Sequence, residues 1–209
     1  MTLDLWLAFV AASLVLLIIP GPTIVLVMSY AISQGRRVAV AVAAGVALGD
    51  FIAMTASLLG LGALVLASAT LFTVLKWIGA VYLAWMGVKL LIASGQITKG
   101  IAPGDAPPLP ARAVFWHAAL VTALNPKSIA FFVAFVPQFI RTDAPLMPQF
   151  AILIATFVTL ATLNALSYAL LADRMGNRLR GPRALVWMNR AGGTALIGMG
   201  ALTALLKRA

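Results

Sequence analysis

The sequence predicts an all-α membrane protein with about six transmembrane helices, on the strength of three observations. Hydrophobic residues make up 63% of the 209 positions and charged residues only 10%, so a soluble fold would expose large apolar patches. The apolar residues gather in stretches that each approach the roughly 20 residues needed to cross a bilayer as helix. Most lysines and arginines lie in the gaps between these stretches. We therefore expect one transmembrane domain over residues 1–209.

The expected helices follow one another closely. The first is interrupted at Pro20, Gly21 and Pro22 and the fourth at Asn125 and Pro126, because proline cannot continue a helix. The stretch 94–112 is rich in proline and glycine and is expected to form a cytoplasmic loop, and a basic loop is expected over residues 173–190. Helices are expected at residues 5–33, 38–62, 70–93, 113–140, 148–172 and 191–206.

The two halves of the chain, residues 1–93 and 113–209, resemble each other. Gly79 and Gly87 have the same spacing as Gly192 and Gly200, and the first helix of each half is broken by proline. Three helices per half would insert the second half upside down, which is the inverted repeat of many secondary transporters. Coincidence is the alternative, because glycine and proline are common in membrane helices.

The distribution of positive charge predicts the orientation. Cytoplasmic loops carry an excess of lysine and arginine, so the more basic side is expected to be cytoplasmic and both termini outside. A net charge of +10 is explained in the same way, and nucleic acid is not expected as a partner. The basic residues on the expected cytoplasmic side are Arg36, Arg37, Lys89, Lys99, Arg112, Arg174, Arg178, Arg180, Arg183 and Arg190, against Lys76, Arg141, Lys207 and Arg208 outside.

Three segments carry a resemblance to a known family. They are IIPGPTIVLVMSYAISQGRRVAVAVAAGVALGD at 18–50, LKWIGAVYLAWMGVKLL at 75–91 and LNPKSIAFFVAFVPQF at 124–139. In this combination and order the chain resembles the LysE/RhtB exporters. The resemblance implies gradient-driven efflux of amino acids or related small metabolites across the bacterial inner membrane. Ala39, where a glycine usually follows the paired arginines, and the segment 115–118 depart from the family pattern and leave the substrate open.

Asp50 is the leading candidate for a site residue. It lies roughly 18 Å along its helix from the expected start at Val38, at about 1.5 Å per residue. A carboxylate at the centre of a membrane helix costs on the order of 3 kcal/mol to insert, so it needs a partner, a proton or water. Asp50 could bind a substrate ammonium or exchange a proton. Alternatively, it marks a kink at Gly49 that other polar groups solvate.

Lys127 is expected at a similar depth, roughly 21 Å from the start of its own helix at Ala113. It could pair with Asp50 and open when a substrate ammonium takes its place, leaving Lys127 to meet the substrate carboxylate. A permanent structural ion pair, or a lysine that extends toward one interface, explains its position as well.

The remaining candidates surround the predicted helix breaks or lie elsewhere at depth. Gly21, Pro22, Asn125 and Pro126 could expose backbone groups to a water-filled cavity, or form ordinary proline kinks. Asn164 could line the same cavity or join two helices by a hydrogen bond. Tyr82 could face a bound cation, although aromatic residues of membrane helices more often anchor at an interface.

Other functions and ligands are weighed against this prediction. An intramembrane enzyme would need a cluster of acid, base or metal-binding groups, and the sequence has one histidine and no cysteine. We expect no cofactor, because neither a nucleotide-binding glycine loop nor metal-ligand spacing is present. A structural or assembly subunit of a membrane complex is the alternative to an exporter, and a homodimer is compatible with the glycine-rich helix faces.

Overall fold

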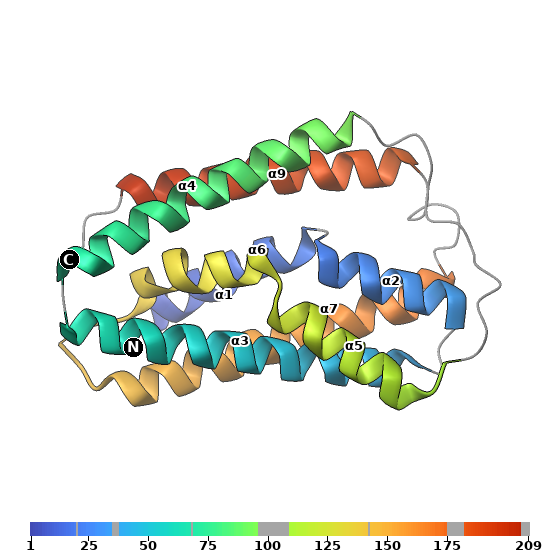
Figure 1. Cartoon of the computed structure of the whole chain (residues 1–209), viewed down its shortest axis with the longest axis horizontal. Coiled ribbons are helices and arrows are strands. Elements are labelled where there is room, and N and C mark those ends of the chain that lie inside the picture. Colours follow the sequence, from blue (N-terminus) through green and yellow to red (C-terminus); the bar gives the residue numbers. More distant parts are fainter. Residues whose placement is uncertain are drawn as a thin grey trace.

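The structure is a computed structural model that describes residues 1–19, 21–34, 38–67, 69–95, 109–141, 143–174 and 182–205. Over these residues every regular element is a helix, and the helices run along the long axis of an elongated bundle (Figure 1). Expectations that concern the basic turn at 35–37 and most of the loop at 94–112 lie outside the described residues.

The first half begins with a broken helix, as predicted. Helix α1 (Leu3–Ile18) stops just before the proline and glycine segment, and α2 (Pro22–Gln34) continues at a bend of 57°. Two long helices follow, α3 (Ala39–Ala67) and α4 (Ala69–Ser94). Helix α3 extends beyond the expected end at residue 62, because the segment after it contains no proline to stop a helix.

The second half also starts with a broken helix. Helix α5 (Ala111–Ala123) ends before the short α6 (Pro126–Ala130), which runs into a π-helix, η2 (Phe131–Phe135), and a 3₁₀ turn, η3 (Val136–Phe139). The predicted break at 125–126 is therefore confirmed. A π-helix is rare and is found mainly at functional sites, where the extra residue per turn rotates the side chains around it.

The last two helices are α7 (Leu146–Arg174) and α9 (Pro182–Leu205). The prediction that residues up to 190 form a loop was wrong, because α9 begins at Pro182. Proline is favoured in the first turn of a helix. Arg183 and Arg190 are exposed on this first part of α9, so the helix carries their charges without burying them.

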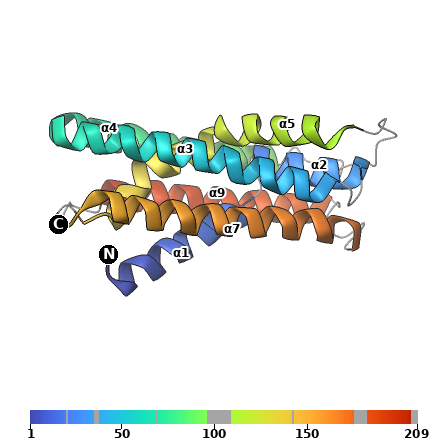
Figure 2. The same cartoon turned by 90° about the horizontal axis from the view of Figure 1, so that it is seen from below.

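The helices form two groups with the broken ones between them. Helices α4 and α9 lie side by side along their length, and α3, α5 and α7 form the other group, while α1, α2 and α6 lie between (Figures 1 and 2). Glycines let the α4 and α9 backbones approach closely. A Cβ added at Gly193 would lie 2.6 Å from the Gly87 carbonyl oxygen, and one at Gly200 would lie 2.7 Å from that of Ala80.

The described helices make the chain a multi-pass membrane protein. Four of them are long and apolar enough to cross a bilayer, and the bent pair α1 and α2 makes a fifth if it is counted as one span. Helix α9 is not among these, so the sixth crossing stays a prediction, as does the inverted repeat. The start of α1 and the end of α9 lie toward the same end of the bundle (Figure 2), although which side of the membrane this end faces stays a prediction.

Candidate functional site

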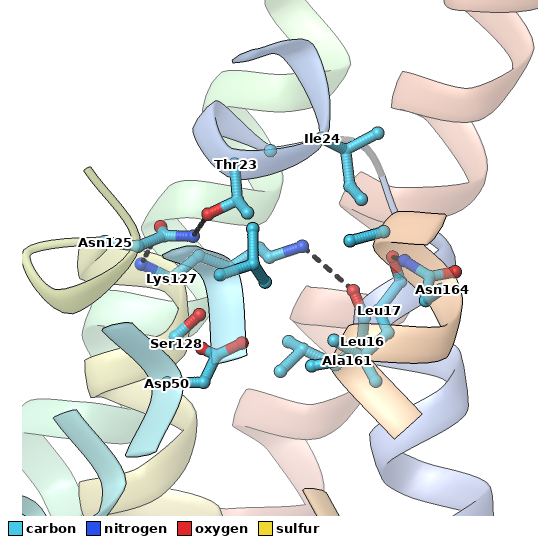
Figure 3. A pocket seen from close by; sticks show the side chains of 13 residues that line it. Leu16, Leu17, Thr23, Ile24, Asp50, Asn125, Lys127, Ser128, Ala161 and Asn164 are labelled. Carbon is cyan, nitrogen blue, oxygen red and sulfur yellow. Dashed lines mark hydrogen bonds between the residues drawn. The ribbon is translucent and has the colours of Figure 1, made fainter. Parts of the chain in front are cut away.

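Most of the predicted site residues meet in one cavity where the broken helices face each other. Its space for the centres of water-sized groups is about 20 Å³, enough for one water or ammonium group but not for a whole amino acid. Its wall is otherwise apolar, with Leu16, Ile24, Val46 and Ala161 among the lining residues. The polar residues that line it are Thr23, Asp50, Asn125, Lys127, Ser128 and Asn164, together with Gly21 (Figure 3).

The carboxyl end of α1 is the first feature of this site. The last carbonyls of a helix have no partner within the helix, and in a membrane they must find one from other parts of the protein. Here the Lys127 ammonium donates to the carbonyl oxygens of Leu16 at 2.9 Å and Ile19 at 2.7 Å. The end of α1 at the break therefore supplies the acceptors for this buried lysine.

The charge of Lys127 is balanced by the helix end. Only 5% of this residue is exposed, and its ammonium sits against the negative end of the α1 dipole. Gly21 leaves room for it, since a Cβ at this position would lie 3.2 Å from the Lys127 Cε. A lysine ammonium has three N–H donors, and two of them bind α1 carbonyls. One donor is left for another partner.

Asp50 approaches the same cavity from α3. It is 2% exposed, and its Oδ1 is buried without a hydrogen-bond partner in the described part of the chain. Gly49 lets α3 pass close to α5, since a Cβ there would lie 2.6 Å from the Ala119 carbonyl oxygen. The Asp50 carboxylate is thus held in a packed interior with one oxygen available.

The two buried charges share the cavity without forming a salt bridge. Among the described residues the charged atoms within 4.0 Å of each other are those of Arg141 and Asp143, on the exposed turn before α7, where hydrogen bonds from Arg141 lower the pKa of Asp143. Asp50 and Lys127 line one cavity, but Lys127 binds the α1 carbonyls, so the direct pairing that the sequence left open is absent from this conformation.

Asn125 organises the second helix break. Its side-chain oxygen accepts the Lys127 backbone N–H at 3.1 Å and caps α6, while its Nδ2 donates to the Thr23 hydroxyl at 3.1 Å. The link ties α6 to the start of α2. Pro22 and Pro126 each begin a helix, where the missing N–H costs nothing, so they act as helix starts rather than as kinks within one helix.

Asn164 and Tyr82 have different surroundings. Asn164 lines the cavity and also joins helices, because its Nδ2 donates to the Leu17 carbonyl at 3.1 Å. Tyr82 is not among the lining residues, and its ring lies 5.5 Å from that of Trp85 on the same helix. The cation that Trp85 faces is the Lys89 ammonium, 4.1 Å from the ring centre.

Sequence reasoning missed three polar residues at or beside the cavity. Thr23 directly follows Pro22 and Ser128 lies two residues after Pro126, so their closeness to the predicted helix breaks could have indicated them. Tyr168 donates to the Ile18 carbonyl at 3.2 Å and lies one helical turn after Asn164, a polar spacing that indicates a shared face. No group of three metal-binding side chains occurs in the described residues.

The chain is similar to known proteins along nearly its whole length. The family model described as LysE type translocator matches residues 14–207. An uncharacterized membrane protein of Vibrio cholerae serotype O1 is 34% identical over 207 residues, which cover 99% of this chain and 100% of that protein. The homoserine/homoserine lactone efflux protein of Salmonella typhimurium is 34% identical over 209 residues, 100% of both chains.

A more distant relative aligns with a large part of the chain. The leucine efflux protein of Klebsiella pneumoniae subsp. pneumoniae is 31% identical over 163 residues, 78% of this chain and 74% of that protein. No solved structure matches. Because the family model covers almost the full length and the Vibrio and Salmonella relatives align from end to end, the chain belongs to the family of LysE-type translocators, which are membrane transporters and not enzymes.

Proposed function

We propose that this protein is a secondary active exporter of amino acids or closely related small metabolites across the bacterial inner membrane, driven by exchange with protons. The names of the Salmonella and Klebsiella relatives support amino acids and their derivatives as the solute class. The sequence contains no nucleotide-binding glycine loop, which agrees with a gradient as the energy source.

The observation that carries this proposal is the pair of unused polar groups in the cavity. Among the described residues the Asp50 Oδ1 has no partner, and Lys127 has one N–H beyond the two that bind α1. An amino acid offers an ammonium and a carboxylate of matching charge. We expect its ammonium to bind Asp50 and its carboxylate to accept from Lys127.

The small volume of the cavity implies that transport requires movement. With room for about one water-sized group, the site cannot hold a whole amino acid in this conformation. Opening requires the helices around the breaks to separate, and breaks in membrane helices are where secondary transporters place such sites. We interpret the structure as a closed state of the transporter.

The position of Asp50 supports exchange with protons. A buried carboxylate costs on the order of 3 kcal/mol at mid-membrane, and no hydrogen bond among the described residues reaches the Asp50 Oδ1. When the solute ammonium leaves, a proton removes that cost, and when the solute returns, the proton must leave. Binding of one therefore excludes the other, which is the requirement for antiport.

Efflux from cells tests this proposal. Cells are loaded with dipeptides that are hydrolysed inside, and the amino acids that appear outside are followed with and without the protein. We expect at least one to leave faster with the wild-type protein, and this gain to be lost in Asp50→Asn. Asp143→Asn, which changes an acid on the exposed turn before α7, serves as the matched control.

Two outcomes would contradict the proposal. If no amino acid leaves faster, the solute class is wrong, and other small metabolites or a role as assembly subunit come next. If Asp50→Asn exports with an unchanged pH dependence, the proton does not bind at Asp50. The homodimer stays a prediction, which the mass of the detergent-solubilised protein would decide.

A further inference from the structure

The carbonyl end of α1 is held by a second helix besides the one that carries Lys127. From α7, Asn164 donates to the Leu17 carbonyl at 3.1 Å, and Tyr168 donates to the Ile18 carbonyl at 3.2 Å. Lys127 binds the carbonyls on either side of these two, those of Leu16 and Ile19. Four consecutive carbonyls of the broken helix therefore each accept a hydrogen bond from a side chain.

The carbonyls of Leu16 and Ile19 set the direction of the Lys127 ammonium. The two carbonyls between them are held by α7, which fixes the orientation of the whole segment 16–19. Inside a membrane a released carbonyl has no water to replace a lost partner, so losing a bond from α7 would turn this segment rather than leave it in place. Loss of a hydrogen bond from α7 would thus change the direction of the Lys127 ammonium.

We propose that Tyr168 is a positioning residue that, by holding the Ile18 carbonyl, aims the third N–H of Lys127 at the substrate carboxylate. This inference rests on the proposed function. Tyr168 does not line the cavity, so its hydroxyl acts on the solute only through α1. Asn164 lines the cavity and could also contact the solute, which makes Tyr168 the clearer residue to test.

The proposal predicts which solutes depend on Tyr168. A solute with a free carboxylate uses Lys127 and should be bound less well when the ammonium is poorly aimed. A solute whose carboxylate is esterified cannot form an ion pair with Lys127, so the aim of the ammonium should affect its binding little. A tyrosine that only joined α1 to α7 would change the transport of both kinds alike.

Transport by purified protein in liposomes, with a pH gradient, tests this prediction. Two solute pairs are compared, homoserine with homoserine lactone and leucine with leucine methyl ester. In Tyr168→Phe we expect the KM of the transported free acid to rise about three- to tenfold, the effect of one lost hydrogen bond. The KM of its ester should stay within about twofold, and so should the maximal rate of both.

A neighbouring hydroxyl on α7 provides the matched control. Ser167 donates to the Leu163 carbonyl of its own helix at 2.7 Å, so Ser167→Ala removes a hydroxyl without touching α1. We expect wild-type KM values for this variant. The ratio of the two KM values within each pair does not depend on how much of a variant folds, so partial loss of protein cannot imitate the result.

The outcomes separate the two proposals. Equal rises in KM for acid and ester, or no change in either, would overturn the positioning role of Tyr168 and leave the exporter intact. Wild-type protein that moves none of the four solutes, and that also exports no amino acid faster in the dipeptide-loaded cells, would overturn amino-acid export itself and the role of Tyr168 with it.

Discussion

Lys127 shows how a buried charge is stabilised without an acid beside it. Its ammonium binds two carbonyls at the negative end of α1, so the helix break supplies the compensation that a salt bridge would otherwise provide. Asp50 consequently keeps an oxygen unused. At the scale of single residues, the site thus consists of the Lys127 ammonium, bound to backbone carbonyls, and the Asp50 carboxylate, whose Oδ1 has no hydrogen-bond partner among the described residues.

Asn125 should matter for stability as well as for the site. Asn125→Ala removes the cap of α6 and the bond to Thr23, so the buried Lys127 backbone N–H loses its acceptor while the Thr23 hydroxyl keeps its bond to Thr122. We expect the free energy of unfolding in detergent to fall by about 1–3 kcal/mol. Denaturant titration of the purified protein measures this change.

Asn189, half-buried on α9, offers a comparison with Asn125. Asn189→Ala should change the free energy of unfolding by no more than about 0.5 kcal/mol, because substitutions away from buried networks have small effects. Equal losses in the two variants would mean that the hydrogen bonds of Asn125 contribute nothing specific.

At the scale of elements, each broken helix consists of one helix that ends before a proline and a second helix that begins at that proline. Helix α1 ends where a new helix begins at Pro22, and α5 ends before the cap at Asn125 and the start at Pro126. The prolines made these breaks predictable. The beginning of α9 was predicted wrongly, because charged residues were taken as a loop although a helix can carry exposed arginines beyond the apolar span.

The seam between α4 and α9 gives a sharp prediction, because two glycines of α9 differ in their surroundings. A Cβ at Gly200 would lie 2.7 Å from the Ala80 carbonyl oxygen, whereas one at Gly198 would meet nothing within 4 Å. Gly200→Ala should force the helices apart and lower stability by about 1–3 kcal/mol. Gly198→Ala should be neutral or stabilise the helix by up to about 1 kcal/mol.

Thermal unfolding of these two variants in the same detergent would check this prediction. A Gly200→Ala protein as stable as the Gly198→Ala protein would show that the α4 and α9 backbones are not in close contact in the folded protein.

At the scale of the whole molecule, the bundle turns apolar side chains toward the bilayer. Exposed residues such as Val40, Val81 and Leu163 lie on different helices, as expected where lipid replaces water as the solvent. The start of α1 and the end of α9 lie toward one end of this bundle (Figure 2), and the positive charges of the sequence predict that this end faces outward.

Labelling of single cysteines tests this orientation, and the chain has no cysteine of its own to interfere. A membrane-impermeant maleimide added to intact cells should label Asp143→Cys, on the exposed turn before α7, and should not label Leu109→Cys until the membrane is opened. The reverse labelling would place the termini inside and contradict the charge-based prediction.

The sequence by itself determined the class of protein and the positions of both helix breaks, and it predicted similar depths for Asp50 and Lys127. These features depend on local properties, namely apolar stretches of membrane-spanning length, prolines that stop helices and the constant rise of an α-helix. Only the tertiary structure decided that Lys127 binds the end of α1, that Tyr168 and Asn164 hold the same carbonyls, and that Tyr82 lies apart. Such contacts join residues more than a hundred positions apart, and they depend on helix packing, which the order of residues along one helix does not specify.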